Sequence, residues 1–142
     1  MAAYYPVFLD LRDRPVVVIG GGRVAARKVA GLVEAGARVR VIAPQVAALL
    51  RAQRIERRRY RPGDLRGAVL AFAAANDRAV NHAVAVEARR RRIPVNVADS
   101  AEECTFLVPA RLRRGDLQIA VSTSGRSPRL AKSLRQRLES VL

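Results

Sequence analysis

The chain has 142 residues, half of them apolar, which suffices for one domain with its own core and a small appendage. Its 27 Lys and Arg against 12 Asp and Glu give a formal charge of +15, which attracts polyanions such as nucleic acid, anionic lipid or a substrate with many carboxylates. No apolar run is long enough to span a bilayer, no signal-peptide pattern opens the chain, and one cysteine excludes an internal disulfide. We therefore expect a cytoplasmic protein without a bound metal.

The stretch RPVVVIGGGRVAARK predicts a buried strand, a glycine turn and a helix. Residues 16–19 are all β-branched, which is typical of a strand buried on both faces. The pattern Gly20-x-Gly22-x-x-Ala25 then opens a helix, where unpaired backbone N–H groups and the helix dipole favour an anion. In this context the glycines predict a pyrophosphate of a dinucleotide, although a tight turn that binds nothing would use the same residues.

The end of the second predicted strand lacks a residue that dinucleotide sites usually have. The helix is expected to stop at Gly36, and a strand follows over residues 38–43. A carboxylate usually ends this strand and binds the adenosine ribose. Here Pro44 and Gln45 follow, so Pro44 can pack on adenine and Gln45 can reach the ribose. The choice between NAD and NADP therefore stays open.

The middle of the chain alternates between predicted strands and helices. The stretches, in chain order, are a short helix QVAALLRAQ, an edge strand IERRRY, a central strand GAVLAFAAA, a helix DRAVNHAVAVEARRRR, a fifth strand IPVNVAD and a sixth strand CTFLVPA. The arginines around the edge strand, in RIERRRYR, are expected to be exposed and to discourage aggregation. The residues of the second long helix that we expect to face the sheet are Ala79, Val80, Ala83, Val84 and Val86. This rhythm predicts a Rossmann-like α/β fold, a doubly wound parallel sheet whose strands all end at one edge.

The C-terminal part of the sequence has a different pattern. A strand, DLQIAVSTS, is followed by a turn and by a helix with Ser127 as N-cap and Pro128 in its first turn. One helix face carries the apolar residues Leu130, Leu134, Leu138 and Val141. Such a strand-helix pair can pack on its own domain or on a second subunit.

Two groups of polar residues are candidates for chemistry. Asp99 follows the fifth strand at the edge where doubly wound enzymes bind ligands, and it suits a general base beside a nicotinamide. A loop aspartate that caps a turn would look the same. Ser122, Thr123, Ser124 and Arg126 precede a helix N-terminus and are typical of an anion cradle, or of an ordinary strand-to-helix turn.

Several stretches together resemble the NAD-dependent precorrin-2 dehydrogenases of siroheme (porphyrin) biosynthesis, some of which are also sirohydrochlorin ferrochelatases. They are YYPVFLDLRDRPVVVIGGGRVAARKVAGLVEAGARVRVIAP, FAAANDRAVNHAV, IPVNVADSAEECTFLVPA and IAVSTSGRSPRLAKSLRQRLE. Within them P-x-F-x-x-L, N-V-x-D and S-x-x-G-x-S-P are more specific than the glycines. The resemblance implies an oxidoreductase that oxidises precorrin-2 to sirohydrochlorin with NAD as its cofactor, a reaction on a CH–CH bond.

The resemblance also assigns roles to residues of this chain. The implied NAD contacts are Gly20, Gly22, Arg23, Val24, Ala25, Pro44, Gln45, Ala74, Ala75 and Asn76. The catalytic aspartate of the family falls on Asp99. The serine-rich loop beside the tetrapyrrole site falls on Ser122, Thr123 and Ser124, with Arg126 adding charge. The many carboxylates of the tetrapyrrole would match the basic character of the chain.

The resemblance further implies a homodimer and a division of the chain. Residues 1–108 would form the NAD-binding Rossmann domain, and residues 109–142 a strand-helix dimerisation segment, without the further helical domain that many relatives have. Whether the chain also acts as a ferrochelatase stays open.

Two other functions fit the same sequence. A non-catalytic module that senses NAD(H) would need the glycine turn but not Asp99. A nucleic-acid binder would use the charge alone, yet the sequence has no helix-turn-helix or RNA-binding motif. We expect a small-molecule substrate, and neither nucleic acid nor a membrane as a partner.

Overall fold

The computed structural model describes residues 3–142, which form two compact units. One unit runs from Phe8 to Phe106, and the other combines the described residues up to Val7 with Leu107–Leu142. In this described part of the chain, no helix is both long and apolar enough to cross a membrane.

The unit Phe8–Phe106 is built on a parallel sheet with the strand order β3-β2-β1-β4-β5. Its strands are β1 (Pro15–Ile19), β2 (Arg38–Ile42), β3 (Arg54–Glu56), β4 (Leu70–Ala73) and β5 (Val95–Val97). The central strand β1 pairs with β2 on one side and β4 on the other, and every pair is parallel. The predicted Rossmann-like α/β fold is confirmed, with β3 at the predicted edge but shorter than predicted.

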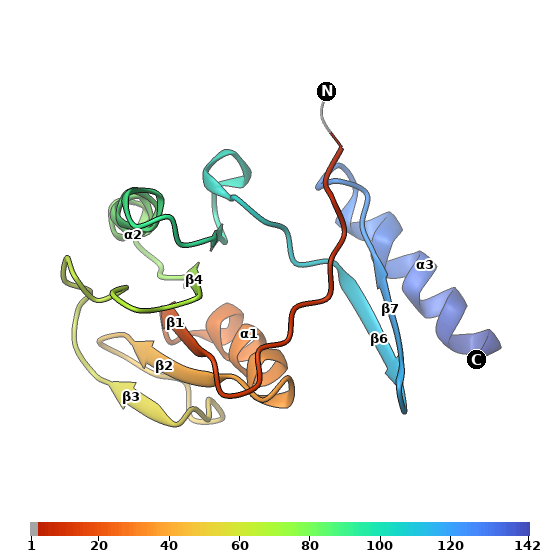
Figure 1. Cartoon of the computed structure of the whole chain (residues 1–142), viewed down its shortest axis with the longest axis horizontal. Helices are drawn as coiled ribbons and strands as arrows, with labels where there is room; N and C mark the ends of the chain where they lie inside the picture. Colours follow the sequence, from red (N-terminus) through yellow and green to blue (C-terminus); the bar gives the residue numbers. More distant parts are fainter. Residues whose placement is uncertain (1–2) are drawn as a thin grey trace. The chain divides into compact units, whose positions relative to one another are not determined.

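The two faces of this sheet are covered by different helices (Figure 1). Val16 of β1 packs in the apolar cluster that includes α1 (Arg23–Glu34). Its neighbour Val17 points to the other face and packs in the cluster that includes α2 (Arg78–Arg90). Because successive side chains of a strand alternate between faces, a strand buried on both sides must be apolar throughout, as β1 is.

The predicted apolar face of α2 is partly wrong. Val84 is buried as predicted, and Val80 is half-buried. The buried face also includes two polar residues, Asn81 and Glu87, each of which finds hydrogen-bond partners in the structure. Three residues that were predicted to face the sheet are exposed: Ala79, Ala83 and Val86.

The segment QVAALLRAQ, predicted as a helix, forms an irregular loop instead. The N–H of Ala47 donates to the carbonyl of Gly21 at 2.7 Å. The Gln53 side chain accepts a hydrogen bond from the N–H of Val39 and donates one to the carbonyl of Ala37. These tertiary partners draw the segment along β2 and the glycine turn, and they outweigh its modest helix propensity.

The segment CTFLVPA, predicted as a sixth strand, follows the edge of β5 without forming a ladder. After the short 3₁₀ turn η1 (Ala101–Glu103), the Cys104 thiol accepts a hydrogen bond from the N–H of Val97. The Thr105 hydroxyl accepts one from the N–H of Val95 at 2.8 Å. Side chains thus occupy backbone groups of β5 that another strand would have paired, and the sheet ends at β5.

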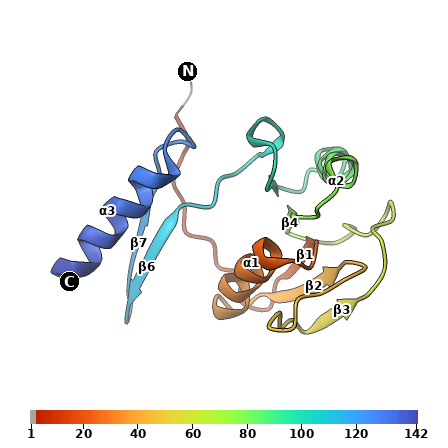
Figure 2. The same cartoon turned by 180° about the vertical axis from the view of Figure 1, so that it is seen from behind.

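The second unit contains a two-stranded antiparallel hairpin and a helix that packs on it (Figure 2). The hairpin is β6 (Ala110–Arg114) and β7 (Leu117–Val121), and the helix is α3 (Pro128–Val141). The sequence predicted β7 but not β6, whose three arginines obscured its alternation. In the described residues of this unit, only Leu112 and Ala131 are buried apolar side chains.

The helix α3 begins as predicted. The Ser127 hydroxyl accepts a hydrogen bond from the N–H of Leu130 at 3.1 Å, and Pro128 lies in the first turn. The N-terminus of α3 therefore has a side-chain cap.

Candidate functional site

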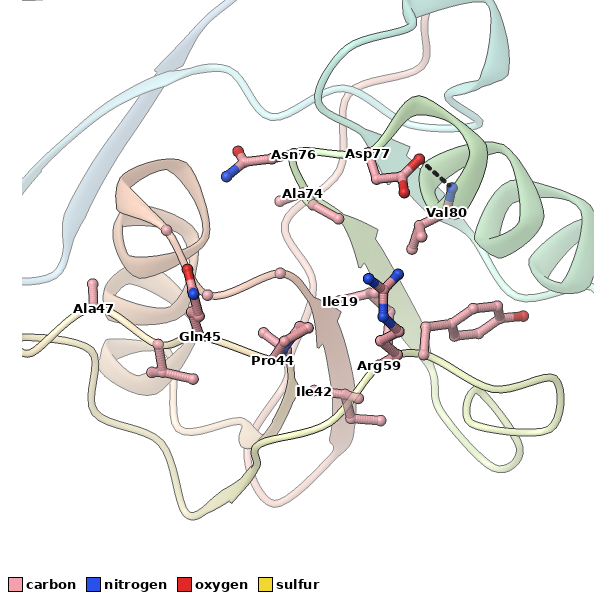
Figure 3. A pocket seen from close by; sticks show the side chains of 17 residues that line it. Ile19, Ile42, Pro44, Gln45, Ala47, Arg59, Ala74, Asn76, Asp77 and Val80 are labelled. Atoms are coloured by element: carbon pink, nitrogen blue, oxygen red, sulfur yellow. Dashed lines mark hydrogen bonds between the residues drawn. The ribbon is translucent and has the colours of Figure 1, made fainter.

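A pocket of about 600 Å³ lies at the carboxyl edge of the sheet in the unit Phe8–Phe106 (Figure 3). This volume falls in the range of small-molecule and cofactor sites. The residues that line it follow β1, β2, β3 and β4, and they are Ile19, Gly20, Gly21, Gly22, Ile42, Ala43, Pro44, Gln45, Val46, Ala47, Arg59, Tyr60, Ala74, Ala75, Asn76, Asp77 and Val80.

The three glycines of the turn have different roles. A Cβ on Gly20, whose φ is +130°, would lie 2.2 Å from the carbonyl oxygen of Ala74, and one on Gly21 would lie 2.2 Å from that of Gln45. A side chain at either position would therefore collide with neighbouring backbone. A Cβ on Gly22 would meet nothing within 4 Å, so its absence leaves open space where a ligand can approach the backbone.

The N-terminus of α1 is open to an anion. Its N-cap, Gly22, offers no side-chain hydrogen bond, and no acidic residue lies in the first turn. The first N–H groups of the helix, on Arg23, Val24 and Ala25, have no partner within the helix. These three predicted contact residues do not line the pocket with their side chains; they present backbone N–H groups and the positive end of the helix dipole.

Other predicted contact residues line the pocket from β2 and β4. Pro44 and Gln45 follow β2, while Ala74, Ala75 and Asn76 follow β4. The loop after β4 is held in place by the buried Asn81 of α2. Its amide accepts a hydrogen bond from the N–H of Ala75 and donates one to the carbonyl of Ala75, both at 3.0 Å.

Three polar residues of the pocket were missed by the sequence analysis: Arg59, Tyr60 and Asp77. The stretch RIERRRYR was interpreted as an exposed edge. Arg59 is exposed as expected and Tyr60 is half-buried, but both line the pocket, which the interpretation missed. Their position directly after an outer parallel strand could have indicated them, because the carboxyl ends of all parallel strands meet at the ligand-binding edge.

Part of the same stretch is an ion-pair network beside β3. Glu56 accepts hydrogen bonds from Arg40 and Arg58, and Arg58 also holds both carboxylate oxygens of Asp64 at 2.9 Å. The hydrogen bond from Arg40 lowers the pKa of Glu56 below its ordinary value. These arginines fix the loop after β3, which carries Arg59 and Tyr60.

Tyr60 connects the pocket wall to a buried carboxylate. Its hydroxyl donates to Glu87, which also accepts hydrogen bonds from the backbone N–H groups of Gly63 and Leu65 and from the Arg91 side chain. Burial raises the pKa of Glu87, but these donors outweigh burial and the net pKa lies below its ordinary value. The pKa of Tyr60 is raised, mainly by burial and secondly by the hydrogen bond to Glu87.

Asp99 lies on the turn after β5 and outside the lining of the pocket. Its Oδ1 accepts a hydrogen bond from Nη1 of Arg78, with 2.6 Å between the two atoms. Arg78 also contacts Glu103, whose other oxygen lies 2.7 Å from Nδ1 of His82, and the hydrogen bond with His82 lowers the pKa of Glu103. Because Arg78 follows Asp77 of the pocket, the start of α2 links the pocket to Asp99.

The predicted serine-rich loop lies in the second unit, between β7 and α3. The Ser122 hydroxyl accepts the N–H of Ser124, whose φ is +58°, and the Thr123 hydroxyl accepts the N–H of Ser127. The carbonyl of Thr123 accepts the N–H of Arg126. Each hydroxyl that accepts still carries an O–H that can donate to an anionic group.

The residues of the pocket fit a dinucleotide. The open cradle at Gly22 and the uncapped N-terminus of α1 suit a pyrophosphate, and apolar walls from Ile19, Ile42 and Val80 suit flat rings. Among residues 3–142, no three His, Cys, Asp or Glu side chains gather in a way that could hold a metal ion.

Comparison with known proteins gives two family matches that follow one another along the chain. Residues 7–110 match the family described as "Putative NAD(P)-binding", and residues 114–140 match the one described as "Sirohaem biosynthesis protein central". The chain is 46% identical to the siroheme synthase of Methylobacillus flagellatus, over 96% of this chain and 31% of that protein. It is 44% identical to the siroheme synthase of Nitrosomonas eutropha, over 98% and 31%. The chain thus spans about a third of the length of these relatives.

A solved structure resembles the whole chain. It is that of SirC, precorrin-2 dehydrogenase, with a TM-score of 0.80 and 35% sequence identity over 98% of this chain and 71% of that one. The match therefore covers both the parallel sheet and the C-terminal hairpin and helix. The chain belongs to the siroheme-biosynthesis family of NAD(P)-binding proteins.

Proposed function

We propose that the chain catalyses the NAD-dependent dehydrogenation of precorrin-2 to sirohydrochlorin. The observation that carries this proposal is the open cradle at Gly22 before the uncapped N-terminus of α1, in a chain whose relatives include a precorrin-2 dehydrogenase. NAD⁺, when bound, would accept the hydride that leaves the substrate.

The backbone of the pocket would hold this cofactor. The N–H groups of Arg23, Val24 and Ala25 would bind its pyrophosphate, and Pro44 and Gln45 would contact the adenosine half. Gly20 and Gly21 are packed against neighbouring backbone and would keep the turn in place for the cofactor.

Asp99 would take the proton that leaves the substrate carbon. Arg78 binds Oδ1, so Oδ2 is the oxygen left to accept a proton. Glu103 and His82 extend this hydrogen-bonded chain and hold Arg78 in place. We assign Asp99 the catalytic role and Arg78 a positioning role.

The tetrapyrrole would be bound by positive charge and hydroxyl groups. The net charge of +15 would raise the local concentration of a polycarboxylate, and Ser122, Thr123, Ser124 and Arg126 would bind its carboxylates.

Anaerobic turnover of precorrin-2 with NAD⁺ tests the proposal, with sirohydrochlorin followed by its absorbance. Asp99→Asn should lower kcat by about 100-fold or more, because the proton acceptor is lost. The control Asp116→Asn, on the exposed turn between β6 and β7, should leave kcat unchanged. NAD⁺ binding should survive in both variants. A wild-type chain that binds NAD⁺ without any turnover would instead support a non-catalytic sensor.

We also propose that residues 109–142 form a dimerisation segment with a second copy of the chain. Leu130, Leu138 and Val141 of α3 are exposed, at 50%, 37% and 77%. A helix face of this kind needs an apolar partner. In sedimentation experiments Leu138→Glu should convert dimers to monomers. The control Gln136→Glu changes an exposed polar residue nearby and should leave the dimer intact. A wild-type monomer at all concentrations would contradict the proposal.

A further inference from the structure

The guanidinium of Arg78 is shared between two carboxylates. Its Nη1 donates to Oδ1 of Asp99 at 2.6 Å, and its Nη2 donates to Oε1 of Glu103. Arg78 is the first residue of α2, Asp99 follows β5 and Glu103 ends η1, so three elements meet at this cation. One cation between two carboxylates cannot neutralise both, and each carboxylate therefore weakens the hold of Arg78 on the other.

His82 can add a second positive charge to this cluster. It lies one turn after Arg78 on α2, and its Nδ1 is 2.7 Å from Oε2 of Glu103, the oxygen that Arg78 does not contact. The hydrogen bond with His82 lowers the pKa of Glu103, so Glu103 stays ionised where histidines titrate, between about pH 5 and 8. Protonated His82 balances Glu103, whereas neutral His82 leaves Arg78 to serve both carboxylates.

The other charged groups near His82 are Arg89, Asp77 and Glu102. Arg89 donates through Nη2 to the carbonyls of Glu102 and Glu103, at 3.4 and 3.3 Å, and so fixes η1. The carboxylate of Asp77 accepts hydrogen bonds from the first turn of α2, and Glu102 is exposed. His82 is the only histidine of the chain, and its side chain is 65% exposed, so it exchanges its proton with solvent. It is therefore the group of this cluster that is suited to change charge near neutral pH.

We propose that Glu103 and His82 are positioning residues that set the basicity of Asp99 through Arg78. The inference rests on the proposed role of Asp99 as the proton acceptor. Ionised Glu103 draws Arg78 away from Asp99, which keeps Asp99 a better base. Protonation of His82 engages Glu103, returns the charge of Arg78 to Asp99 and weakens the base. The proton still passes from the substrate carbon to Oδ2 of Asp99, so the reaction itself is unchanged.

Two substitutions of His82 fix its charge and test this inference. His82→Lys is positively charged and His82→Gln is neutral at both about pH 5.5 and about pH 8. Under anaerobic conditions with saturating precorrin-2 and NAD⁺, kcat of His82→Gln should exceed that of His82→Lys by about threefold at both pH values. The wild type should match His82→Gln at the higher pH and His82→Lys at the lower pH. The KM of either substrate should change by less than about twofold.

A substitution of Glu103 tests the other half of the cluster. Glu103→Gln removes the competing charge and keeps the size of the side chain, so it should lower kcat by about threefold at the higher pH. The matched control is Glu102→Gln, a change to the neighbouring exposed glutamate of η1, which should follow the wild type at both pH values.

The carboxyl ¹³C resonance of Asp99 tests the same interaction without substrate or cofactor. Its titration midpoint should lie about 0.5 pH unit lower in His82→Lys than in His82→Gln, because more of the Arg78 charge then reaches Asp99. Equal midpoints in the two variants would overturn the inference.

The kinetic outcomes separate this inference from the proposed function. Equal kcat in the two His82 variants, beside a large loss in Asp99→Asn, would overturn the role of His82 and leave Asp99 as the proton acceptor. An equal loss in both His82 variants would also overturn it, because the loss would then not depend on charge. If the wild type has no turnover at either pH, the proposed function itself fails.

Discussion

The two units of the chain bury apolar surface to very different extents. In the unit Phe8–Phe106 every sheet residue of β1 after Pro15, and all of β4 and β5, are buried between two helical layers. In the second unit, Leu112 and Ala131 are the only buried apolar residues among those described. The first unit can therefore hold a rigid pocket by itself, whereas the second has too small a core to be stable alone and exposes a helix face that suits a partner.

Separating the units gives the largest expected effect. Expressed alone, residues 107–142 should show no cooperative thermal unfolding by circular dichroism, because chains below about 40 residues rarely bury enough surface to fold. Residues 8–106 should keep a cooperative transition and NAD⁺ binding. A folded, monomeric 107–142 fragment would contradict the conclusion that the core of the second unit is too small to be stable alone.

Two glycine substitutions should separate folding from binding within the first unit. Gly20→Ala should destabilise the protein by about 4 kcal/mol or more, because its Cβ would strike the Ala74 carbonyl and its φ is +130°. Gly22→Ala should change the free energy of unfolding by less than about 0.5 kcal/mol yet weaken NAD⁺ binding by about tenfold, since its Cβ fills the open cradle. Urea unfolding and calorimetry measure the two effects. Equal loss of stability in both variants would show that Gly22 also has a packing role.

A smaller effect is expected at Glu87, the buried carboxylate that accepts a hydrogen bond from Tyr60. Glu87→Gln should cost about 1–3 kcal/mol at pH 7, because one acceptor oxygen is replaced by a donor facing other donors. The folded-state pKa of Glu87 is lowered, so its ionisation stabilises the fold above the ordinary pKa of 4.5, and this stability is lost as the pH falls through the folded-state value.

Urea unfolding between pH 7 and pH 3 measures this contribution. The decline in stability below pH 4.5 should be shallower in Glu87→Gln than in the wild type. Glu102→Gln, an exposed glutamate of η1, should retain the wild-type slope.

The smallest effect is expected on the surface of α3. Arg135 and Glu139 form an ion pair one turn apart, with Nη1 and Oε2 2.7 Å apart. A double-mutant cycle with Arg135→Gln and Glu139→Gln should give a coupling of about 0.3–0.5 kcal/mol that disappears in 1 M salt. A coupling above about 1 kcal/mol would mean that this pair is shielded from solvent, for example by a partner.

Local patterns were sufficient to predict the elements that position the pocket. The apolar run of β1 and the glycines act through their own backbone or near neighbours, and the parallel sheet follows from the alternation of strands and helices. The failures have a common cause. Gln53, Thr105 and Glu87 bond to groups that are distant in sequence, and no periodicity shows such partners.

The same reason explains which parts of the site were missed. Gly22, Pro44 and Gln45 lie in motifs that a sequence displays directly. Arg59 lies in a run of arginines, and the run itself does not show which member is held in ion pairs, as Arg58 is, and which lines the pocket.

The bond between Cys104 and the edge of β5 gives the molecule a built-in chemical reporter. Cys104 is the only cysteine of the chain, and its half-buried thiol is engaged with Val97 and Ser100. Its hydrogen bonds should slow a thiol reagent, so the labelling rate should rise when this edge detaches under native conditions. Measured with and without a dinucleotide, the labelling rate would show whether an occupied pocket makes local opening at β5, the strand before Asp99, less frequent.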